Sequence, residues 1–109
     1  MPTAAESRDR IFQALGDPSR RAIFETLARG EAVVKDLTER FDISQPAVSQ
    51  HLATLKRAGL VSGRREGRNV YYRVEPKGMK PLIDWMAHYQ VFWTDRLGRL
   101  AQLLEKMDR

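Results

Sequence analysis

The first sixty residues carry short apolar stripes, each bounded by residues that start or stop a helix. Apolar positions at steps of three or four predict four helices, over about 3–16, 18–29, 34–41 and 45–58. Thr3, Asp17 and Ser44 precede three of these stretches, and their side chains suit the free N–H groups of a helix start. We therefore expect a helical body with closely spaced turns.

The pattern changes after Gly59. In the segment 69–74, Val70 and Tyr72 alternate with more polar neighbours at a period of two, which is typical of a half-buried strand. A second strand is predicted over 61–65, and Glu66-Gly67-Arg68 supplies the turn between the two. The segment 61–74 is thus predicted to be a β-hairpin.

The last predicted helix is long and runs from about residue 79 or 80 to residue 106. One apolar stripe follows it in steps close to a heptad seam: Leu82, Met86, Tyr89, Trp93, Leu97, Leu100, Leu104 and Met107. Trp85 and Phe92 begin a second apolar line, seven residues apart. A helix with two apolar lines needs two partners, of which one is its own domain and the other is most simply a second copy of the chain.

Composition narrows the class of protein. A chain of 109 residues with 42% hydrophobic and 30% charged residues is expected to form one folded domain. It has no cysteine, so disulfides and thiolate metal sites are excluded. No glycine-rich phosphate loop or paired nucleophile and base is present, which speaks against an enzyme, and no cofactor is expected. Neither a signal peptide nor a membrane span is recognisable, so the expected location is the cytoplasm.

The positive charge is concentrated in one stretch. Residues 44–74 contain six basic residues and one acidic residue, whereas the rest of the chain has thirteen of each. The whole net charge of +5 therefore lies in 31 residues. A local positive field of this kind suits a polyanion such as DNA.

The two short helices over 34–59 are joined by a tight turn and indicate a helix-turn-helix. On the second helix Val48, Leu52 and Leu55 share one face and are expected in the core, leaving small polar residues outside. Such side chains suit a helix in the DNA major groove, where an amide can both donate to and accept from adenine. The predicted contacts on this helix are Ser44, Gln45, Pro46, Ser49, Gln50, His51, Lys56 and Arg57.

Four of these assignments stay open. Ser44 is a helix cap and can also position a phosphate, while His51 lies between the core and outward faces and suits either packing or DNA contact. Lys56 and Arg57 also favour the helix C-terminal dipole. Gln45 is the best candidate for a base contact.

The basic hairpin is the second predicted contact with DNA. Arg64, Arg65, Arg68 and Asn69 surround its tip. A basic wing adds phosphate contacts, and an arginine at its tip can enter the minor groove. Arg68 is the expected tip contact.

With these features in place, the chain resembles the ArsR-type family of bacterial winged-helix repressors. The resemblance is carried by Gly16-Asp17-Pro18-Ser19-Arg20-Arg21, by the stretch from Ile43 to Leu52, by Leu55 to Val61, and by the hairpin from Arg64 to Tyr72. It implies a homodimer built from the first and last helices, Phe12 included, that binds a near-palindromic operator and is released by an effector.

The expected architecture is mainly α with a small β-hairpin, a winged helix-turn-helix with a long C-terminal dimerisation helix. A single domain spans residues 1–109, with dimerisation helices at 1–16 and 79–107, the helix-turn-helix at 34–59 and the wing at 61–74. The predicted function is a dimeric, sequence-specific transcriptional regulator that represses its own or neighbouring genes.

The sensing half departs from the metal-responsive members of the family. At the two positions where those members resemble a Cys-Val-Cys motif, this chain has Val33 and Lys35. Asp84 and His88 are four residues apart but lack further ligands, so a surface pair is favoured over zinc and no metal site is predicted.

Two alternatives remain. One is an architectural or non-specific DNA-binding protein, which would spread its charge over several surfaces. The other is the same repressor with a small-molecule or metal effector at the dimer interface, where Trp85, Tyr89, Phe92 and Trp93 could line an apolar pocket. Their spacing is also that of an ordinary core, which we favour.

Overall fold

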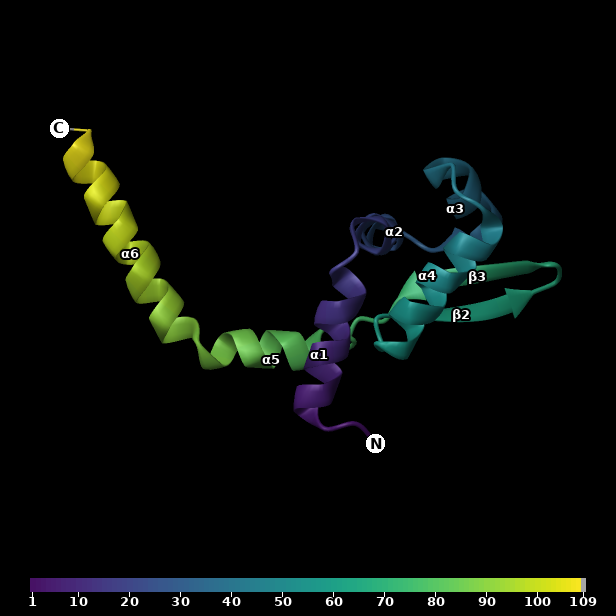
Figure 1. The fold of residues 1–109 in the computed structure, drawn as a ribbon, viewed down its shortest axis with the longest axis horizontal. Helices are drawn as coiled ribbons and strands as arrows, with labels where there is room; N and C mark the ends of the chain where they lie inside the picture. The colour runs from purple at the N-terminus through teal and green to yellow at the C-terminus, as the bar shows by residue number, and fades with distance from the viewer. Residues whose placement is uncertain (109) are drawn as a thin grey trace.

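The computed structural model describes residues 1–108, except for the side chains of Val91 and Trp93. It consists of six helices and a small sheet (Figure 1). In chain order the elements are α1 (Ala4–Leu15), α2 (Pro18–Arg29), β1 (Ala32–Val33), α3 (Val34–Phe41), α4 (Gln45–Arg57), β2 (Val61–Glu66), β3 (Asn69–Val74), α5 (Lys80–His88) and α6 (Gln90–Met107). The predicted class, mainly α with a small β-hairpin in a winged helix-turn-helix, is confirmed.

Helix starts lie where the capping residues predicted them. The side chain of Thr3 accepts from the N–H of Glu6 at 3.1 Å, and that of Asp17 accepts from the N–H of Arg20 at 2.9 Å. These bonds satisfy N–H groups that the helix itself leaves without a partner.

Two arginines after the Asp17-Pro18 start join α2 to the end of α1. Arg20 donates to the carbonyls of Ala14 and Gln13, at 2.8 and 3.1 Å, and Arg21 donates to the carbonyl of Leu15 at 2.5 Å. The last carbonyls of α1 are thereby satisfied by side chains of the next helix. This role for the arginine pair was not predicted.

The core is apolar throughout the described chain and draws on α1 to α5 and on the sheet. Its buried members are Ile11, Ala14, Ile23, Leu27, Leu37, Val48, Leu52, Leu55, Leu60, Val61 and Leu82. No polar or charged residue among the described ones is buried. The two helices of the helix-turn-helix therefore stand on the same core as the wing.

The sheet has one more strand than the sequence predicted. Its order is β1-β3-β2, and Ala32 and Val33 pair with Tyr72 and Tyr71 of the hairpin. A two-residue strand is too short to show a period of two, which is why the pattern missed it. The added strand ties the wing to the segment between α2 and α3.

The prediction of one continuous last helix is wrong. The helix breaks at Tyr89, whose φ of −106° and ψ of 13° separate α5 from α6. The Tyr89 N–H bonds to the carbonyl of Met86 at 3.1 Å, so α5 closes with a tight turn of the i to i−3 type. The apolar stripe continues through the break, so the periodicity of the sequence could not reveal that the helix ends at Tyr89.

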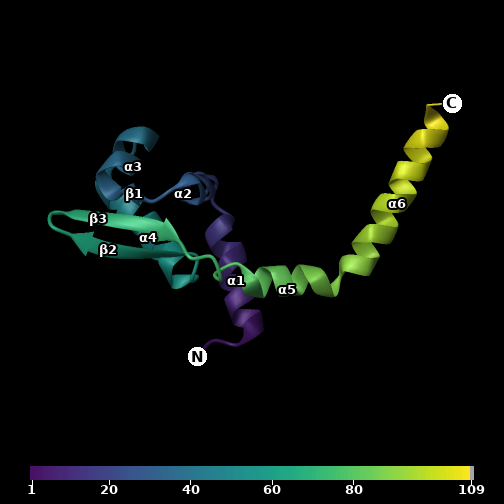
Figure 2. The same ribbon diagram turned by 180° about the vertical axis from the view of Figure 1, so that it is seen from behind.

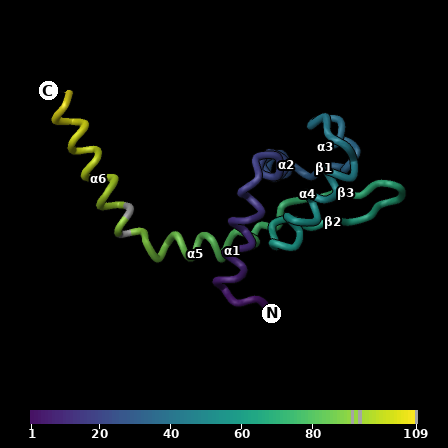
Figure 3. The backbone as a smooth tube through the Cα atoms, in the orientation of Figure 1, coloured from purple at the N-terminus to yellow at the C-terminus, as the bar shows by residue number. Residues whose placement is uncertain are grey.

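α5 and α6 differ in what they contact. α5 packs beside α1, where the rings of Phe12 and Trp85 meet edge to face with centroids 5.5 Å apart. α6 extends away from the body, and the β2–β3 hairpin extends on the opposite side (Figures 1, 2 and 3). One end of the molecule thus offers a helical arm and the other a wing.

Gly78 sits at a close approach between the exit of the wing and the end of α4. A Cβ there would clash with the carbonyl oxygen of Gly59 and would lie 3.1 Å from that of Glu75. We expect Gly78→Ala to lower the free energy of unfolding by about 1–3 kcal/mol, because backbone must shift to make room. Urea denaturation measures it.

Gly98 provides the matched control for this substitution. It lies inside α6, and nothing comes within 4 Å of an added Cβ. Gly98→Ala is expected to leave stability unchanged or to raise it by up to about 1 kcal/mol, since alanine favours a helix interior. Equal effects of the two substitutions would contradict the close approach at Gly78.

Candidate nucleic-acid interface

α4 has one buried face and one free polar face. Val48, Leu52 and Leu55 are completely buried, whereas Gln45 and Ser49 are exposed. Within the described chain no hydrogen bond engages either exposed side chain. The helix therefore presents polar groups that are available to a partner, as its periodicity predicted.

The turn before α4 sets the angle between the two helices of the motif. Asp42 adopts the left-handed conformation, with φ of 50° and ψ of 44°, which aspartate tolerates better than most residues. Two residues later, the Ser44 hydroxyl accepts from the N–H of Ala47 at 3.2 Å. The capping role of Ser44 is confirmed, and its role towards phosphate stays a prediction.

α4 and the β2–β3 hairpin, which forms the wing, border the same groove. A groove of about 350 Å³ is lined by Gln45 and Ser49 from α4, by Arg68 and Asn69 from the hairpin tip, and by Lys35 from α3. Val33, Val34, Val70 and Tyr72 complete its lining. Four of the predicted DNA-contacting residues are thus brought together from two segments about twenty residues apart in the sequence.

Lys35 adds a positive charge to this groove that the sequence reasoning did not include. It is exposed near the start of α3 and lines the groove together with Gln45. Lys35 lies outside the basic stretch 44–74, so a search for charge runs could not select it. Only the packing of α3 against α4 brings it there.

The two adjacent arginines of β2 lie on opposite faces of the sheet. Arg65 pairs with Val70, whose side chain lines the groove, and no contact engages the Arg65 guanidinium within the described chain. Arg64 pairs with Tyr71 on the other face. Successive strand residues point to opposite faces, so the two arginines cannot serve the same surface.

Arg64 is already engaged by two acidic residues. Its guanidinium donates to the carboxylates of Glu66 and Glu31, and it stacks over the Tyr71 ring at 4.7 Å. The hydrogen bonds with Glu66 and then Glu31 raise the pKa of Arg64 above its usual value. Arg64 was predicted to contact DNA, but in the free protein its charge is partnered.

His51 was expected either to pack in the fold or to contact DNA. It is half-buried, its Nδ1 is buried with no partner in the described chain, and it does not line the groove. It lies close enough to Asp17 to act on that carboxyl. The backbone N–H of Arg20 lowers the Asp17 pKa most, burial opposes this, and the charges of Arg20 and His51 lower it further.

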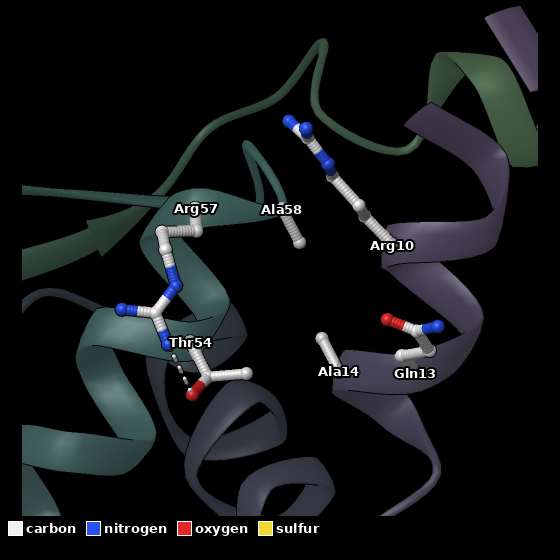
Figure 4. Close-up of a pocket in the computed structure, with 6 residues that line it drawn as sticks. All are labelled: Arg10, Gln13, Ala14, Thr54, Arg57 and Ala58. Atoms are coloured by element: carbon white, nitrogen blue, oxygen red, sulfur yellow. Dashed lines mark hydrogen bonds between the residues drawn. The ribbon is translucent and has the colours of Figure 1, made fainter. Parts of the chain in front are cut away.

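The far end of α4 borders a different hollow (Figure 4). Thr54, Arg57 and Ala58 line it from α4, and Arg10, Gln13 and Ala14 line it from α1. Its volume is about 380 Å³, and Arg57 donates to the Thr54 hydroxyl at 3.2 Å. Lys56 and Arg57 are therefore separated from the groove that holds Gln45, while Pro46 and Gln50 are exposed closer to it.

Most residues predicted for dimerisation are exposed in the single chain. Their exposed fractions range from 42% to 63% for Phe12, Met86, Tyr89, Leu97, Leu100 and Leu104. Leu82 instead belongs to the core of its own chain, and the side chain of Trp93 lies outside the described residues.

An apolar groove follows the bend between α5 and α6. Its volume is about 490 Å³, and it is lined by Ile83, Met86, Ala87, Gln90, Thr94 and Leu97. Trp85 does not line it but packs against the core, as ordinary core spacing had suggested.

The acidic and histidine residues of α5 have local partners. Asp84 forms an ion pair with Lys80 at 2.7 Å, and the rings of His88 and Tyr89 meet edge to face with centroids 5.1 Å apart. Across the described chain, no cluster of three potential metal-ligating residues is found. None of the described helices combines the length and apolar character needed to cross a membrane.

Comparison with known proteins identifies the class of regulator. A model of the bacterial regulatory protein family arsR matches residues 17–62. The HTH-type transcriptional regulator Rv2034 of Mycobacterium tuberculosis is 43% identical over 99 residues, covering 91% of this chain and 90% of the relative. The transcriptional repressor SdpR of Bacillus subtilis is 36% identical over 81 residues, covering 74% of this chain and 90% of the relative.

The likeness extends to solved structures. A crystal structure of an ArsR family transcriptional regulator matches with a TM-score of 0.75 at 33% identity, covering 86% of this chain and 97% of the other. These relatives are regulators rather than enzymes. The chain therefore belongs to the ArsR family of bacterial regulatory proteins and is a DNA-binding transcription regulator with a winged helix-turn-helix fold.

Proposed function

We propose that this protein is a homodimeric repressor that binds a near-palindromic operator in the cytoplasm and represses its own or neighbouring genes. The observation that carries the proposal is the groove shared by Gln45 and Ser49 of α4 and Arg68 and Asn69 of the wing. A reading helix and a basic wing that border one concave surface can contact adjacent grooves of one duplex.

The two sides of this groove would divide the work of recognition. Gln45 and Ser49 have short polar side chains without partners in the described chain, and they suit base edges in the major groove. The start of α4 directs N–H groups outward for a phosphate, beside Ser44. Arg65 and Arg68 have exposed guanidinium groups, without an ion-pair partner among the described residues, for the backbone or the minor groove.

Dimerisation would follow from the exposed apolar side chains of α1, α5 and α6. Leu97, Leu100 and Leu104 are at least half exposed on an arm that extends away from the body (Figure 1). Contiguous apolar surface of this kind marks an interaction site. A second copy offers the same surface, and the resulting two-fold symmetry would require a near-palindromic operator.

Binding to specific and scrambled duplexes at several salt concentrations tests sequence specificity. The operator for this test is obtained by selection from a random duplex pool. We expect about 10³-fold or tighter preference for the selected site at physiological salt. Equal affinities for both duplexes would support the architectural alternative and contradict the repressor.

Gln45→Ala is expected to relax the preference at one base pair of each half-site. Loss of a bidentate amide contact removes about 1–3 kcal/mol of discrimination against the wrong base. Competition between operators that differ at single positions measures it. An unchanged base preference in this variant would show that Gln45 makes no base contact.

Arg68→Ala is expected to weaken binding to every duplex by a similar factor. Because a phosphate contact carries no sequence information, the slope of log affinity against log salt should fall by about 0.9. Arg29→Ala is the control, since Arg29 is exposed at the end of α2 and does not line the groove. A loss confined to one sequence would instead indicate base reading by Arg68.

A further inference from the structure

The outward face of the wing carries a cluster of charged groups that links the hairpin to the body. Glu31 directly precedes β1, whereas Arg64 and Glu66 both lie on β2. Arg64 Nη2 lies 2.5 Å from Glu31 Oε1, and its Nη1 donates to Glu66. Glu31 and Arg64 are 33 residues apart in the sequence, so the contact joins two separate parts of the fold.

The Tyr71 ring holds this cluster against the sheet. Tyr71 lies on the central strand β3, between its neighbours Val33 on β1 and Arg64 on β2. The guanidinium carbon of Arg64 lies 4.7 Å from the Tyr71 ring centroid, within the range of a cation–π contact. The arginine side chain thus spans the sheet from its edge strand to the loop before β1.

We infer that Glu31, Arg64 and Glu66 form a brace that holds the wing beside α4, and that Arg64 is a positioning residue and not a phosphate contact. The inference deepens the proposed function and rests on it, because it assumes that the wing contacts DNA. The brace keeps Arg68 and Asn69 at the groove that Gln45 and Ser49 line.

Charge and direction both separate Arg64 from the phosphate contacts. One guanidinium between two carboxylates leaves the brace with one net negative charge, which does not attract a phosphate. Arg64 also lies on the face opposite to Val70, and Val70 lines the groove. Arg65, its neighbour in sequence, lies on the groove side with no acidic partner in the described chain.

Removing Glu31 distinguishes the two roles by the sign of the effect. If Arg64 bound phosphate, Glu31→Gln would release it and tighten operator binding. If Arg64 braces the wing, the same substitution loosens the wing and weakens binding, by roughly two- to fivefold, as expected for an exposed ion pair. We expect Glu31→Gln to bind the operator more weakly. If it binds more tightly than the control variant Glu39→Gln does, the inference is overturned.

Glu39→Gln is the matched control for the loss of one negative charge. Glu39 is exposed on α3, and no contact within the described chain engages it. Its removal reports the general effect of added positive charge on DNA affinity. The effect of Glu31→Gln is therefore read relative to Glu39→Gln.

Salt dependence separates Arg64 from Arg65. Arg65→Gln is expected to lower the slope of log affinity against log salt by about 0.9, because one phosphate contact is lost. Arg64→Gln is expected to weaken binding by roughly two- to fivefold with the slope unchanged. A slope that falls equally in both variants would make Arg64 a phosphate contact and overturn the brace.

A measurement without DNA keeps the brace and the proposed function distinguishable. In the free protein, hydrogen exchange of the amides in the ladder between β2 and β3 should be faster in Arg64→Gln and unchanged in Arg65→Gln. Unchanged exchange in Arg64→Gln overturns the brace. If Arg65→Gln and Arg68→Ala both leave operator affinity unchanged, the wing does not contact DNA, and that part of the proposed function fails even if the exchange result supports a brace.

Discussion

Replacing Leu52 with alanine is expected to lower the free energy of unfolding by about 2–5 kcal/mol. Leu52 is completely buried at the middle of α4, in the cluster that joins the helix-turn-helix to the wing. The loss combines the transfer of the removed methyl groups with a cavity that rigid neighbours fill only in part. Because the total free energy of unfolding of a domain is about 5–15 kcal/mol, this substitution removes a large fraction of it.

Urea or thermal denaturation of both proteins measures the effect of Leu52→Ala. The matched control is Gln50→Ala on the exposed side of the same helix, which should change stability by no more than about 0.5 kcal/mol. A loss below 1 kcal/mol in Leu52→Ala would contradict a tightly packed core beneath α4. An unchanged stability of Gln50→Ala would show that this exposed side chain contributes little to folding.

Placing lysine at both Leu100 and Leu104 is expected to separate the homodimer into monomers. Both side chains are half exposed on α6, where two charges would have to be buried in the proposed interface. Lysine favours helices, so the arm itself should persist. A monomer engages one half-site only, and operator affinity should fall by about 10²- to 10⁴-fold with the loss of bivalency.

Sedimentation shows the oligomeric state, and circular dichroism shows whether the helices persist. Gln102→Lys is the control, since it adds charge to the same helix at an exposed polar position. It should remain dimeric and bind the operator normally. A double lysine variant that sediments as a dimer would rule out α6 as the main interface.

The helix boundaries were largely predictable because they depend on short-range chemistry. Thr3, Asp17 and Ser44 each accept a backbone N–H three residues on, so the sequence alone indicates where these helices begin. The buried face of α4 followed from its periodicity in the same way. Local hydrogen bonds and helical spacing therefore account for the parts of the fold that were predicted.

Two features of the fold were missed because the spacing of apolar residues does not record them. β1 exists because Ala32 and Val33 pair with the hairpin, about forty residues later. The break at Tyr89 interrupts an apolar stripe that reads as continuous. The strand depends on tertiary pairing, and the break leaves no mark in the apolar spacing.

The sequence predicted most residues of the candidate site, but it did not predict which face of the sheet each arginine occupies. Gln45, Ser49, Arg68 and Asn69 were predicted and do line one groove. Arg64 was grouped with them by charge, although the period of two along β2 already places adjacent residues on opposite faces. Its pairing with Glu31 could not be found from sequence spacing, since it depends on the third strand.

The close approach of Gly78 to Gly59 brings the turn before α5 against the end of α4. Gly59 lies two residues after the end of α4, and α5 begins two residues after Gly78. α4 is about 20 Å long, given its thirteen residues at about 1.5 Å each, and Gln45 lies at the end away from Gly59. A tilt of the helix by about 5° about the Gly59 end would move Gln45 by more than about 1.5 Å, which exceeds the about 0.5 Å range of good hydrogen-bond lengths. The close packing of Gly78 on Gly59 therefore helps to fix the position of the proposed base contact.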